Sequence, residues 1–311
     1  MTTLVSAPSP GSAQDGGSGD STPFLQVSDL RVFLPTGPRR EIEAVTSVSL
    51  EVRRGERVGI VGESGSGKSV TGRAIAGLLP TNPRVRVSGS IRFDGREMVG
   101  ARPKDWDEVR TRSVGMIFQD PLTFLNPVMK VGAQVREAIP ADRGKRVPVD
   151  SPDILRFLQL AGLEDAVDLA GRYPHELSGG QRQRVLIAIG IAKGPDLILA
   201  DEPTTALDAT VQRHVLATLS DTVTALDTAL IMISHDLAVV ASMTERIYVM
   251  YAGRVVESGP TRQVLDSPQH LYTQALLRSV RSLTEKDTEL WSIPPELRRE
   301  IDELVRNGDH A

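Results

Sequence analysis

The chain has 311 residues, of which 40% are hydrophobic and 24% are charged, and its formal net charge is −4. This composition is typical of a globular chain with one large domain or two smaller ones, and it argues against a nucleic-acid partner. The absence of cysteine excludes disulfides, thiolate metal sites, iron–sulfur clusters and cysteine nucleophiles. No apolar run approaches the roughly 18 residues of a membrane span, and no secretory signal is visible, so we expect a cytosolic address.

The first part of the chain predicts a leader followed by a β edge. Residues 1–22 are mostly Ser, Gly, Pro, Ala and Thr, which bury too little apolar surface to order the backbone, so we expect a disordered leader. Apolar and polar residues alternate in residues 24–33 and 42–52, on either side of a Pro/Gly turn. This pattern predicts two half-exposed antiparallel strands.

The next segments alternate between strand and helix patterns. Residues 57–61 form an apolar strand that runs into a glycine-rich turn, and residues 68–79 have helical periodicity. Further strands are predicted at the following ranges: 90–95, 114–118, 197–200 and 229–233. The last two of these ranges are continuously apolar, which favours a parallel sheet covered on both faces.

The remaining segments complete the expected organisation. Residues 130–192 are mainly helical and are interrupted by the polar stretch 142–150, so we expect a helical subdomain over approximately residues 120–192. A helix is predicted over residues 210–226, and a hairpin is predicted from residues 247–251 and 254–257 around Gly253.

A phosphate-binding motif follows the first predicted strand of the sheet. It comprises Gly62, Glu63, Ser64, Gly65, Ser66, Gly67, Lys68 and Ser69. Because this P-loop pattern lies between a strand and a helix N-terminus, its backbone N–H groups can surround phosphates. Lys68 can reach the β- and γ-phosphates, and Ser69 can ligate Mg²⁺. The pattern predicts binding of ATP with Mg²⁺.

Two carboxylates, Asp201 and Glu202, close the apolar strand at residues 197–200. In the functional interpretation, Asp201 holds the metal directly or through water, and Glu202 polarises the attacking water. In the structural interpretation, the pair starts a loop and caps a helix.

Residues Ser178, Gly179, Gly180 and Gln181 follow Leu177 and open the helical segment 182–192. A serine and two glycines at a helix start make a second anion cradle. With this segment the chain resembles the ATP-binding-cassette (ABC) family. The resemblance covers roughly residues 24–280 and implies an α/β fold with a P-loop, RecA-like core, an antiparallel β edge and a helical subdomain.

Lesser landmarks follow in the order of that family. Gln119 resembles its Q-loop residue, Asp208 in Ala206-Leu207-Asp208 its D-loop, and His235 its switch histidine. Taken singly, a histidine after a strand is more often a surface or capping residue and a glutamine after phenylalanine more often a loop residue, and Asp208 could simply cap the following helix. Phe33 is the nearest candidate for the aromatic residue that stacks on adenine, although Leu34 holds an adjacent register and Phe33 is also a candidate core residue.

The resemblance implies a composite ATP site between two cassettes arranged head to tail. Ser178 and Gly180 would donate to the γ-phosphate of the partner's nucleotide, His235 would contact the γ-phosphate held by Lys68, and Gln119 would sense Mg²⁺ and the attacking water. The implied partners are a second cassette, either a copy or a paralogue, two membrane permeases and, indirectly, an extracytoplasmic solute-binding protein. The implied location is the cytoplasmic face of the membrane.

Segments outside the nucleotide motifs indicate the branch of the family. Residues 119–127, 250–260 and 270–277 resemble ATPase subunits of bacterial dipeptide, oligopeptide and nickel importers. The chain departs from that branch after Ser282, where many members carry cysteines. We therefore expect an ATPase energising solute import, of peptides first and of nickel or another small solute as the alternative. Two competing hypotheses are a soluble cassette ATPase that acts without a channel and a degenerate cassette that only scaffolds its partner.

The last segment of the chain, residues 283–311, is expected to be an extension with a short helix. Residues Leu297, Ile301, Leu304 and Val305 place an apolar stripe on one face of a helix over residues 296–306. This helix either docks on its own domain or contributes to the contact between cassettes. In the second interpretation the tail is expected to lie apart from the P-loop residues 62–69, so that removing residues 290–311 leaves nucleotide binding intact.

Overall fold

The protein is described by a computed structural model over residues 22–37, 40–81, 84–140, 148–205, 207–284 and 293–308. Its strands are β1 (Leu25–Gly37), β2 (Arg40–Val52), β3 (Arg57–Val61), β4 (Arg86–Phe93), β5 (Arg96–Glu97), β6 (Val114–Ile117), β7 (Leu197–Asp201), β8 (Ala229–Ser234), β9 (Arg246–Tyr251) and β10 (Arg254–Pro260).

The helices lie between and after these strands. They are α1 (Lys68–Ile75), α2 (Pro103–Arg112), α3 (Pro121–Phe124), α4 (Val131–Ala138), α5 (Pro152–Leu160), α6 (Ala166–Ala170), α7 (Gly179–Ile191), α8 (Ala209–Leu226), α9 (Leu237–Met243), α10 (Thr261–Asp266), α11 (Leu271–Thr284) and α12 (Pro295–Asn307), with a 3₁₀ turn at Pro174–Glu176.

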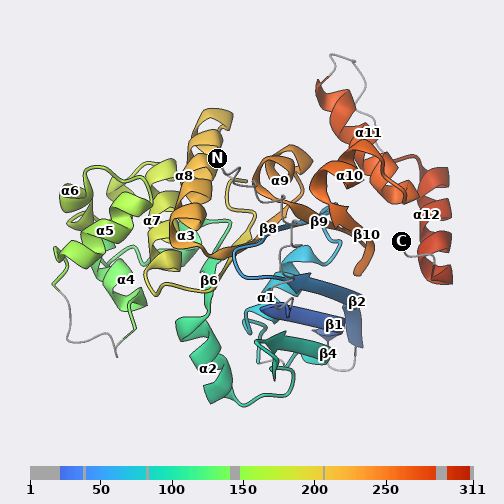
Figure 1. Ribbon diagram of the computed structural model, residues 1–311, viewed down its shortest axis with the longest axis horizontal. Helices are drawn as coiled ribbons and strands as arrows, with labels where there is room; N and C mark the ends of the chain where they lie inside the picture. The colour runs from blue at the N-terminus through green and yellow to red at the C-terminus, as the bar shows by residue number, and fades with distance from the viewer. Residues whose placement is uncertain are drawn as a thin grey trace, which may run out of the picture.

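All strands belong to one sheet in the order β5-β4-β1-β2-β10-β9-β3-β8-β7-β6. Strands β9, β3, β8, β7 and β6 pair in parallel, whereas β1 pairs antiparallel with β2 and β4. Figure 1 shows β1, β2 and β4 as a layer below α1, apart from the parallel strands. The predicted α/β fold with an antiparallel edge is therefore present.

The parallel strands are covered on both faces, as their continuous apolar sequence predicts. In β7, Leu197 and Leu199 join the buried cluster around α1 and the antiparallel layer. Ile198 and Ala200 point to the opposite face and join the cluster that includes α7 and α8. The alternation places β7 and its neighbours at the centre of the molecule.

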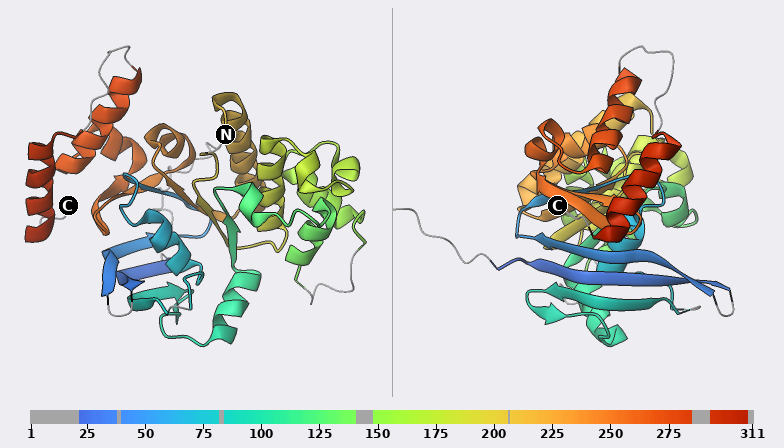
Figure 2. Two further views of the ribbon diagram at one scale, coloured as in Figure 1. Left: turned by 180° about the vertical axis from the view of Figure 1, so that it is seen from behind. Right: turned by 90° about the vertical axis from the view of Figure 1, so that its right-hand side faces the viewer.

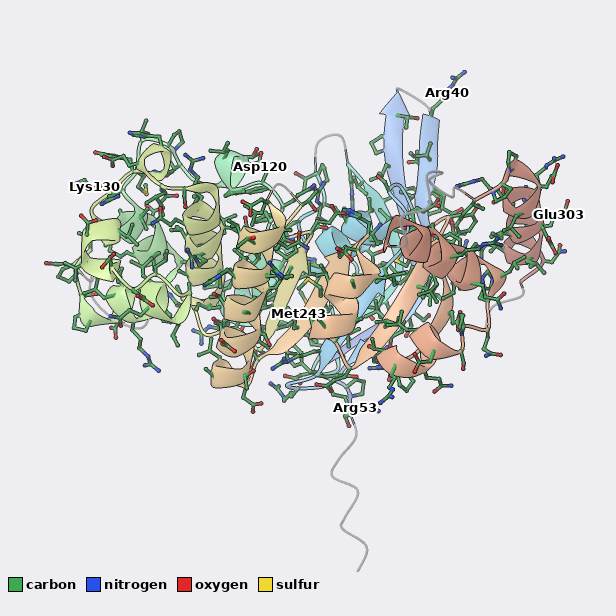
Figure 3. The ribbon with its side chains drawn as sticks, turned by 90° about the horizontal axis from the view of Figure 1, so that it is seen from above. Arg40, Arg53, Asp120, Lys130, Met243 and Glu303 are labelled. Carbon is green, nitrogen blue, oxygen red and sulfur yellow. The ribbon has the colours of Figure 1, made fainter. Side chains whose placement is uncertain are left out.

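Strands β1 and β2 are longer than the sequence pattern predicts. β1 continues through Pro35 to Gly37, and β2 begins at Arg40. Pro35 is paired with Glu41 near the end of the ribbon, where the alternating pattern is already lost. Figure 3 shows Arg40 at the end of this projecting pair of strands.

Two further expectations needed adjustment. The helix predicted over residues 68–79 ends at Ile75 because Gly77 takes a left-handed φ of +64° and leaves no room for a Cβ beside Trp106. The strand predicted over residues 90–95 is shifted to Arg86–Phe93, since Asp94 and Gly95 both have positive φ and form the turn into β5. Helix α2 was not predicted.

Helices α3 to α7 gather at one end of the molecule, and α10 to α12 lie at the other end (Figures 1 and 2). In α12, Ile301 and Val305 are buried and Leu297 packs against the same core cluster. The predicted apolar stripe therefore docks on the chain's own domain.

Some expectations concern residues outside the described ranges. These are the leader up to residue 21, most of the polar interruption at residues 142–150, Ala206 before the D-loop aspartate, and residues 285–292 between α11 and α12. None of the helices within the described ranges combines the length and apolar character that crossing a bilayer requires.

Candidate active site

The predicted chemical residues gather at the carboxyl ends of neighbouring parallel strands. The P-loop follows β3, His235 follows β8, Asp201 and Glu202 follow one another at the end of β7, and Gln119 lies just beyond β6. These strands are adjacent in the order β3-β8-β7-β6. Carboxyl ends of parallel strands meet at one edge, which is where α/β proteins bind their ligands.

Two glycines of the P-loop are required by its geometry. Gly62 has φ +151°, and a Cβ there would lie 2.2 Å from the carbonyl oxygen of Met250 in β9. Gly67 has φ +98°, and its Cβ would lie 2.6 Å from the carbonyl oxygen of Ala44 in β2. The loop is therefore pressed against two strands and opens α1 with backbone that only glycine adopts readily.

The side chain of Lys68 is held inside the loop. It is only 4% exposed, and its Nζ donates to the carbonyl oxygens of Gly62 and Glu63, each at 2.7 Å. Burial lowers the pKa of Lys68, while the charges of Glu202, Asp201 and Glu63 act in the opposite direction. The loop thus holds the ammonium group of Lys68 among its own carbonyl oxygens, where a phosphate oxygen can replace them as the acceptor.

Ser69 and Asp201 connect the P-loop to the end of β7. The Ser69 hydroxyl donates to Oδ1 of Asp201 at 2.7 Å. Burial raises the pKa of Asp201, whereas the hydrogen bond from Ser69 lowers it. A hydroxyl and a carboxylate oxygen at this separation form the oxygen donor set that Mg²⁺ prefers.

Glu202 adopts a left-handed backbone with φ +48°, which a non-glycine residue rarely does. Its N–H donates to the carbonyl oxygen of Ile233, and its Oε2 accepts from the Thr205 hydroxyl at 2.9 Å. Its Oε1 lies 3.3 Å from Nδ1 of His235, whose side chain is 53% exposed. The strained backbone turns this carboxylate toward the histidine at the end of the next strand.

The Ser-Gly-Gly segment forms a second group of residues at the start of α7. The Ser178 hydroxyl accepts from the N–H of Gln181, and the Gln181 side chain accepts from the N–H of Ser178, which is a capping box. Ser178 and Gly179 are exposed, whereas Gly180 is buried. The exposed helix start presents backbone donors outward.

Asp208 caps α8, since its Oδ1 accepts from the N–H groups of Thr210 and Val211. This is the capping role that the sequence offered as the alternative to a D-loop role. Gly180 is close to this helix start, because a Cβ there would lie 2.6 Å from Cγ1 of Val211. The segments 178–181 and 207–211 are therefore neighbours.

The two remaining residues predicted for the site are Gln119 and Phe33. Gln119 is exposed at the edge, next to Phe118, whose carbonyl oxygen accepts from Gln183 at 3.1 Å. Phe33 lies in β1, paired with Arg86 in β4, and its ring carries the Arg86 guanidinium 3.7 Å from the centroid. Adenine stacking on Phe33 stays a prediction, and one ring face already has a cationic neighbour.

Sequence reasoning missed contacts of the P-loop with the C-terminal helices. The N–H of Glu63 donates to the Tyr272 hydroxyl at 2.9 Å, and Arg298 Nη2 lies 3.2 Å from Glu63 Oε2. The expectation that the tail lies apart from the P-loop is wrong, because α12 folds back onto it. The motif His270-Leu-Tyr272 was noticed, but no local pattern indicates which loop its tyrosine reaches.

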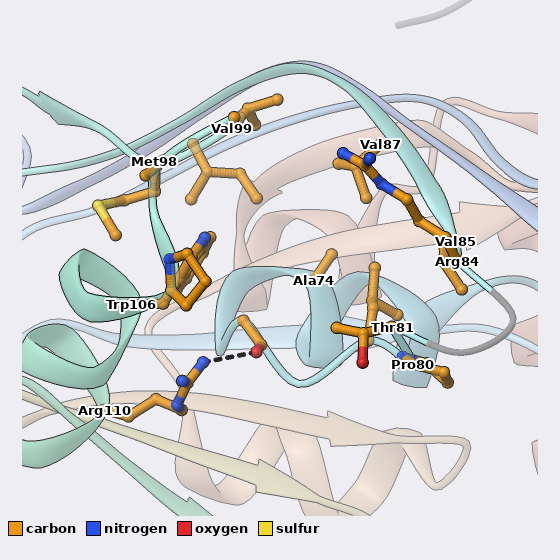
Figure 4. Close-up of a pocket in the computed structure, with 16 residues that line it drawn as sticks. Ala74, Pro80, Thr81, Arg84, Val85, Val87, Met98, Val99, Trp106 and Arg110 are labelled. Atoms are coloured by element: carbon orange, nitrogen blue, oxygen red, sulfur yellow. Dashed lines mark hydrogen bonds between the residues drawn. The ribbon is translucent and has the colours of Figure 1, made fainter.

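An apolar cavity of about 500 Å³ lies away from this edge, at the C-terminal end of α1 (Figure 4). Trp106 of α2, Met98 and Val87 line it, and Arg110 donates to the carbonyl oxygen of Gly77 beside it at 2.8 Å. Since none of its lining residues belongs to the P-loop or to the strand ends that carry acidic residues, this cavity is separate from the candidate site.

Comparison with known proteins identifies the family. A family profile described as "ABC transporter" matches residues 45–205, and one described as "Oligopeptide/dipeptide transporter, C-terminal region" matches residues 256–304. The second match continues past Ser282 and includes most of α12, so the resemblance extends further along the chain than the motifs indicated.

Curated relatives and solved structures agree with these matches. The chain is 43% identical over 271 residues to the oligopeptide transport ATP-binding protein OppD of Salmonella typhimurium, covering 87% of this chain and 80% of that protein. It is 45% identical over 260 residues to the probable D,D-dipeptide transport ATP-binding protein DdpD of Escherichia coli, covering 82% and 78%.

A structure of the ATP-binding cassette MJ0796, described as dimeric and bound to ADP and Pi, superposes with a TM-score of 0.64 at 28% identity, covering 76% of this chain and 99% of that one. The P-loop edge of the sheet, the two family profiles and these relatives lead to the same conclusion. The chain belongs to the ABC transporter family, as a cassette ATPase that carries the C-terminal region of oligopeptide/dipeptide transporters.

Proposed function

We propose that this protein is the ATPase subunit that energises peptide import through a membrane ABC transporter. The observation that carries the proposal is the hydrogen bond from Ser69 to Asp201, next to the buried Lys68. Peptides are the proposed cargo because the curated relatives are named for oligopeptide or dipeptide transport. Nickel or another small solute is the alternative cargo.

The residues of the edge have distinct proposed roles. The P-loop from Gly62 to Ser69 binds the phosphates of ATP through its N–H groups and Lys68. Ser69, Asp201 and Gln119 are the proposed Mg²⁺-binding residues, and this ion neutralises the charge that develops on the phosphates. Glu202 orients and deprotonates the attacking water.

His235 is proposed to hold Glu202 in position relative to the γ-phosphate of ATP. Its Nδ1 faces Glu202 at 3.3 Å, and its side chain is 53% exposed. The exposed Ser178 and Gly179, with Gly180 and Gln181, are proposed to complete the ATP site of a partner cassette, together with Asp208. Neither chain then has a complete site alone.

Closure of two cassettes would deliver motion to two permease subunits on the cytoplasmic face of the membrane, with an extracytoplasmic binding protein supplying the solute. Exposed apolar side chains beside Gln119 support a docking surface for a permease. Leu122, Phe124 and Val128 are all exposed, and the Phe124 ring stacks on Phe118 at 3.7 Å between centroids. A neighbouring hollow of about 500 Å³ is lined by Phe118, Leu78 and Ile139.

The function is tested by reconstituting the protein with its permeases and binding protein in vesicles. We expect ATP-dependent uptake of labelled oligopeptides and peptide-stimulated ATP hydrolysis, both lost in Glu202→Gln. Stimulation by a nickel chelate and not by peptides would assign the alternative cargo. ATP hydrolysis that no permease alters would instead favour a soluble cassette.

A further inference from the structure

Residues of the C-terminal helices contact the P-loop at Glu63. Tyr272, near the start of α11, is fully buried, and its hydroxyl accepts the N–H of Glu63 at 2.9 Å. Lys68 Nζ donates to the carbonyl oxygen of the same residue at 2.7 Å. Glu63 is thus bound through its N–H by α11 and through its carbonyl by the lysine of the loop.

The position of Tyr272 is fixed by packing. Its ring lies against that of Tyr251 with centroids 4.5 Å apart, and Tyr251 donates to Oδ1 of Asp302 in α12 at 2.7 Å. Ile301, beside Asp302, is completely buried. The position of the Tyr272 hydroxyl at the P-loop therefore depends on how α11, β9 and α12 pack together.

A second contact acts on the side chain of Glu63. Arg298 Nη2 of α12 lies 3.2 Å from Oε2 and 3.4 Å from Oε1. The Glu63 charge is close enough to act on Lys68, since it raises the pKa of that lysine. A carboxylate in a phosphate-binding loop repels phosphate, and an arginine beside it offsets that repulsion.

We propose that Tyr272 and Arg298 are positioning residues that tie ATP affinity to the docking of α11 and α12. Tyr272 fixes the backbone of Glu63, and Arg298 neutralises its carboxylate. This inference rests on the proposed use of the P-loop as the ATP site. It gives the C-terminal region of the chain a role at the nucleotide and makes α12 a point at which affinity can be altered.

The backbone contact is tested with two matched substitutions of buried tyrosines in the full chain, using titration with a fluorescent ATP analogue. Tyr272→Phe removes only the hydroxyl, and we expect about three- to tenfold weaker binding, the usual worth of one hydrogen bond. Tyr248→Phe removes a buried hydroxyl that is bonded to Glu51 and contacts neither the loop nor the C-terminal helices, so its affinity should change less than about twofold. Equal affinities in both variants and the unsubstituted chain would overturn the Tyr272 role.

The charge contact is tested at side chains outside the buried core, with Arg298 45% and Glu63 33% exposed, so that folding is preserved. We expect Arg298→Gln to weaken binding about two- to fivefold at low salt and less at high salt. Adding Glu63→Gln to Arg298→Gln should restore affinity, because the unpaired carboxylate is gone. A double variant as weak as Arg298→Gln alone would show that Arg298 does not act through the Glu63 charge.

Thermal unfolding of each variant separates these outcomes from a general loss of stability. If the unsubstituted chain binds no ATP analogue, the proposed ATP site itself fails, and the inference fails with it. If it binds ATP and none of the variants differs, only the inference fails.

Discussion

Nδ1 of His235 lies 3.3 Å from Oε1 of Glu202, which brings together two residues from the ends of adjacent strands β8 and β7. Lys68 lies at the start of α1, after the neighbouring strand β3, and the Glu202 charge acts on it. The edge therefore combines one cation suited to bind phosphate with one carboxylate suited to act on water. The two roles are separable by substitution.

We expect Lys68→Ala to reduce ATP affinity about 10- to 100-fold, because a charge-assisted contact with phosphate is lost. Glu202→Gln should keep ATP affinity within about threefold and reduce turnover about 10²- to 10⁴-fold, since only the base is removed. Binding is measured with a fluorescent ATP analogue and turnover by phosphate release.

Glu303→Gln is a suitable control, because this carboxylate is exposed on α12. This substitution should change neither the ATP affinity nor the turnover. Equal loss of affinity in Lys68→Ala and Glu202→Gln would contradict the separate roles.

The sequence predicts this site well because each motif is local. Gly62 and Gly67 lie within one loop, and the acidic pair ends one apolar strand, so short-range spacing is sufficient to place them. Tyr272 and Arg298 reach the P-loop only through tertiary packing, which no short pattern encodes.

The same distinction applies to the fold. The hairpin of β9 and β10 follows from two short apolar segments on either side of Gly253, and the structure confirms it. Helix α2 was missed because its residues between Pro103 and Arg112 are mostly charged, and only Val109 is buried. The helix contributes little of the periodicity on which prediction depends.

A composite site also predicts complementation between defective chains. If the cassette pairs with a copy of itself, Lys68→Ala and the exposed-site variant Ser178→Arg should each hydrolyse ATP at a small fraction of the normal rate. Their mixture should recover a substantial part of it, because one site of each mixed pair has an intact P-loop and an intact partner segment. Phosphate release is measured at several mixing ratios.

Activity of the unsubstituted chain should rise more steeply than linearly with concentration or upon addition of a partner cassette. A demonstrated monomer with constant specific activity would refute the composite site. Activity that rises only on addition of a paralogous partner cassette would instead assign a heterodimer.

Lys193, just after α7, predicts a pH dependence of stability. Burial and the charge of Arg110 lower its pKa from 10.5 to about 8. Between these values the unfolded chain binds more protons than the folded one, so the contribution of Lys193 to stability rises as pH increases. At pH 7 the folded chain holds this lysine in its charged form, which lowers the free energy of unfolding.

Lys193→Met should therefore be more favourable, relative to the unsubstituted chain, at pH 7 than at pH 9.5. We expect the difference in unfolding free energy between the two chains to shift by about 2 kcal/mol over this range. Urea unfolding at both pH values measures it. A difference that is the same at pH 7 and pH 9.5 would show that the lysine titrates as it does in the unfolded chain.

Substitution of Ile301 distinguishes docking of α12 on its own domain from burial of its apolar stripe at a contact between cassettes. Its side chain is completely buried within the single chain, whereas Glu303 on the same helix is exposed. Because the cavity left by truncation forms inside one domain, we expect Ile301→Ala to lower the free energy of unfolding by about 2 to 4 kcal/mol. Glu303→Ala should change it by less than about 0.5 kcal/mol.

The loss of stability in Ile301→Ala should be the same at low and high protein concentration. Urea unfolding over a roughly hundredfold range of protein concentration measures it. A loss that appears only where the chain is dimeric would place the apolar stripe at the contact between cassettes, since a subunit interface contributes to stability in proportion to how much of the chain is paired.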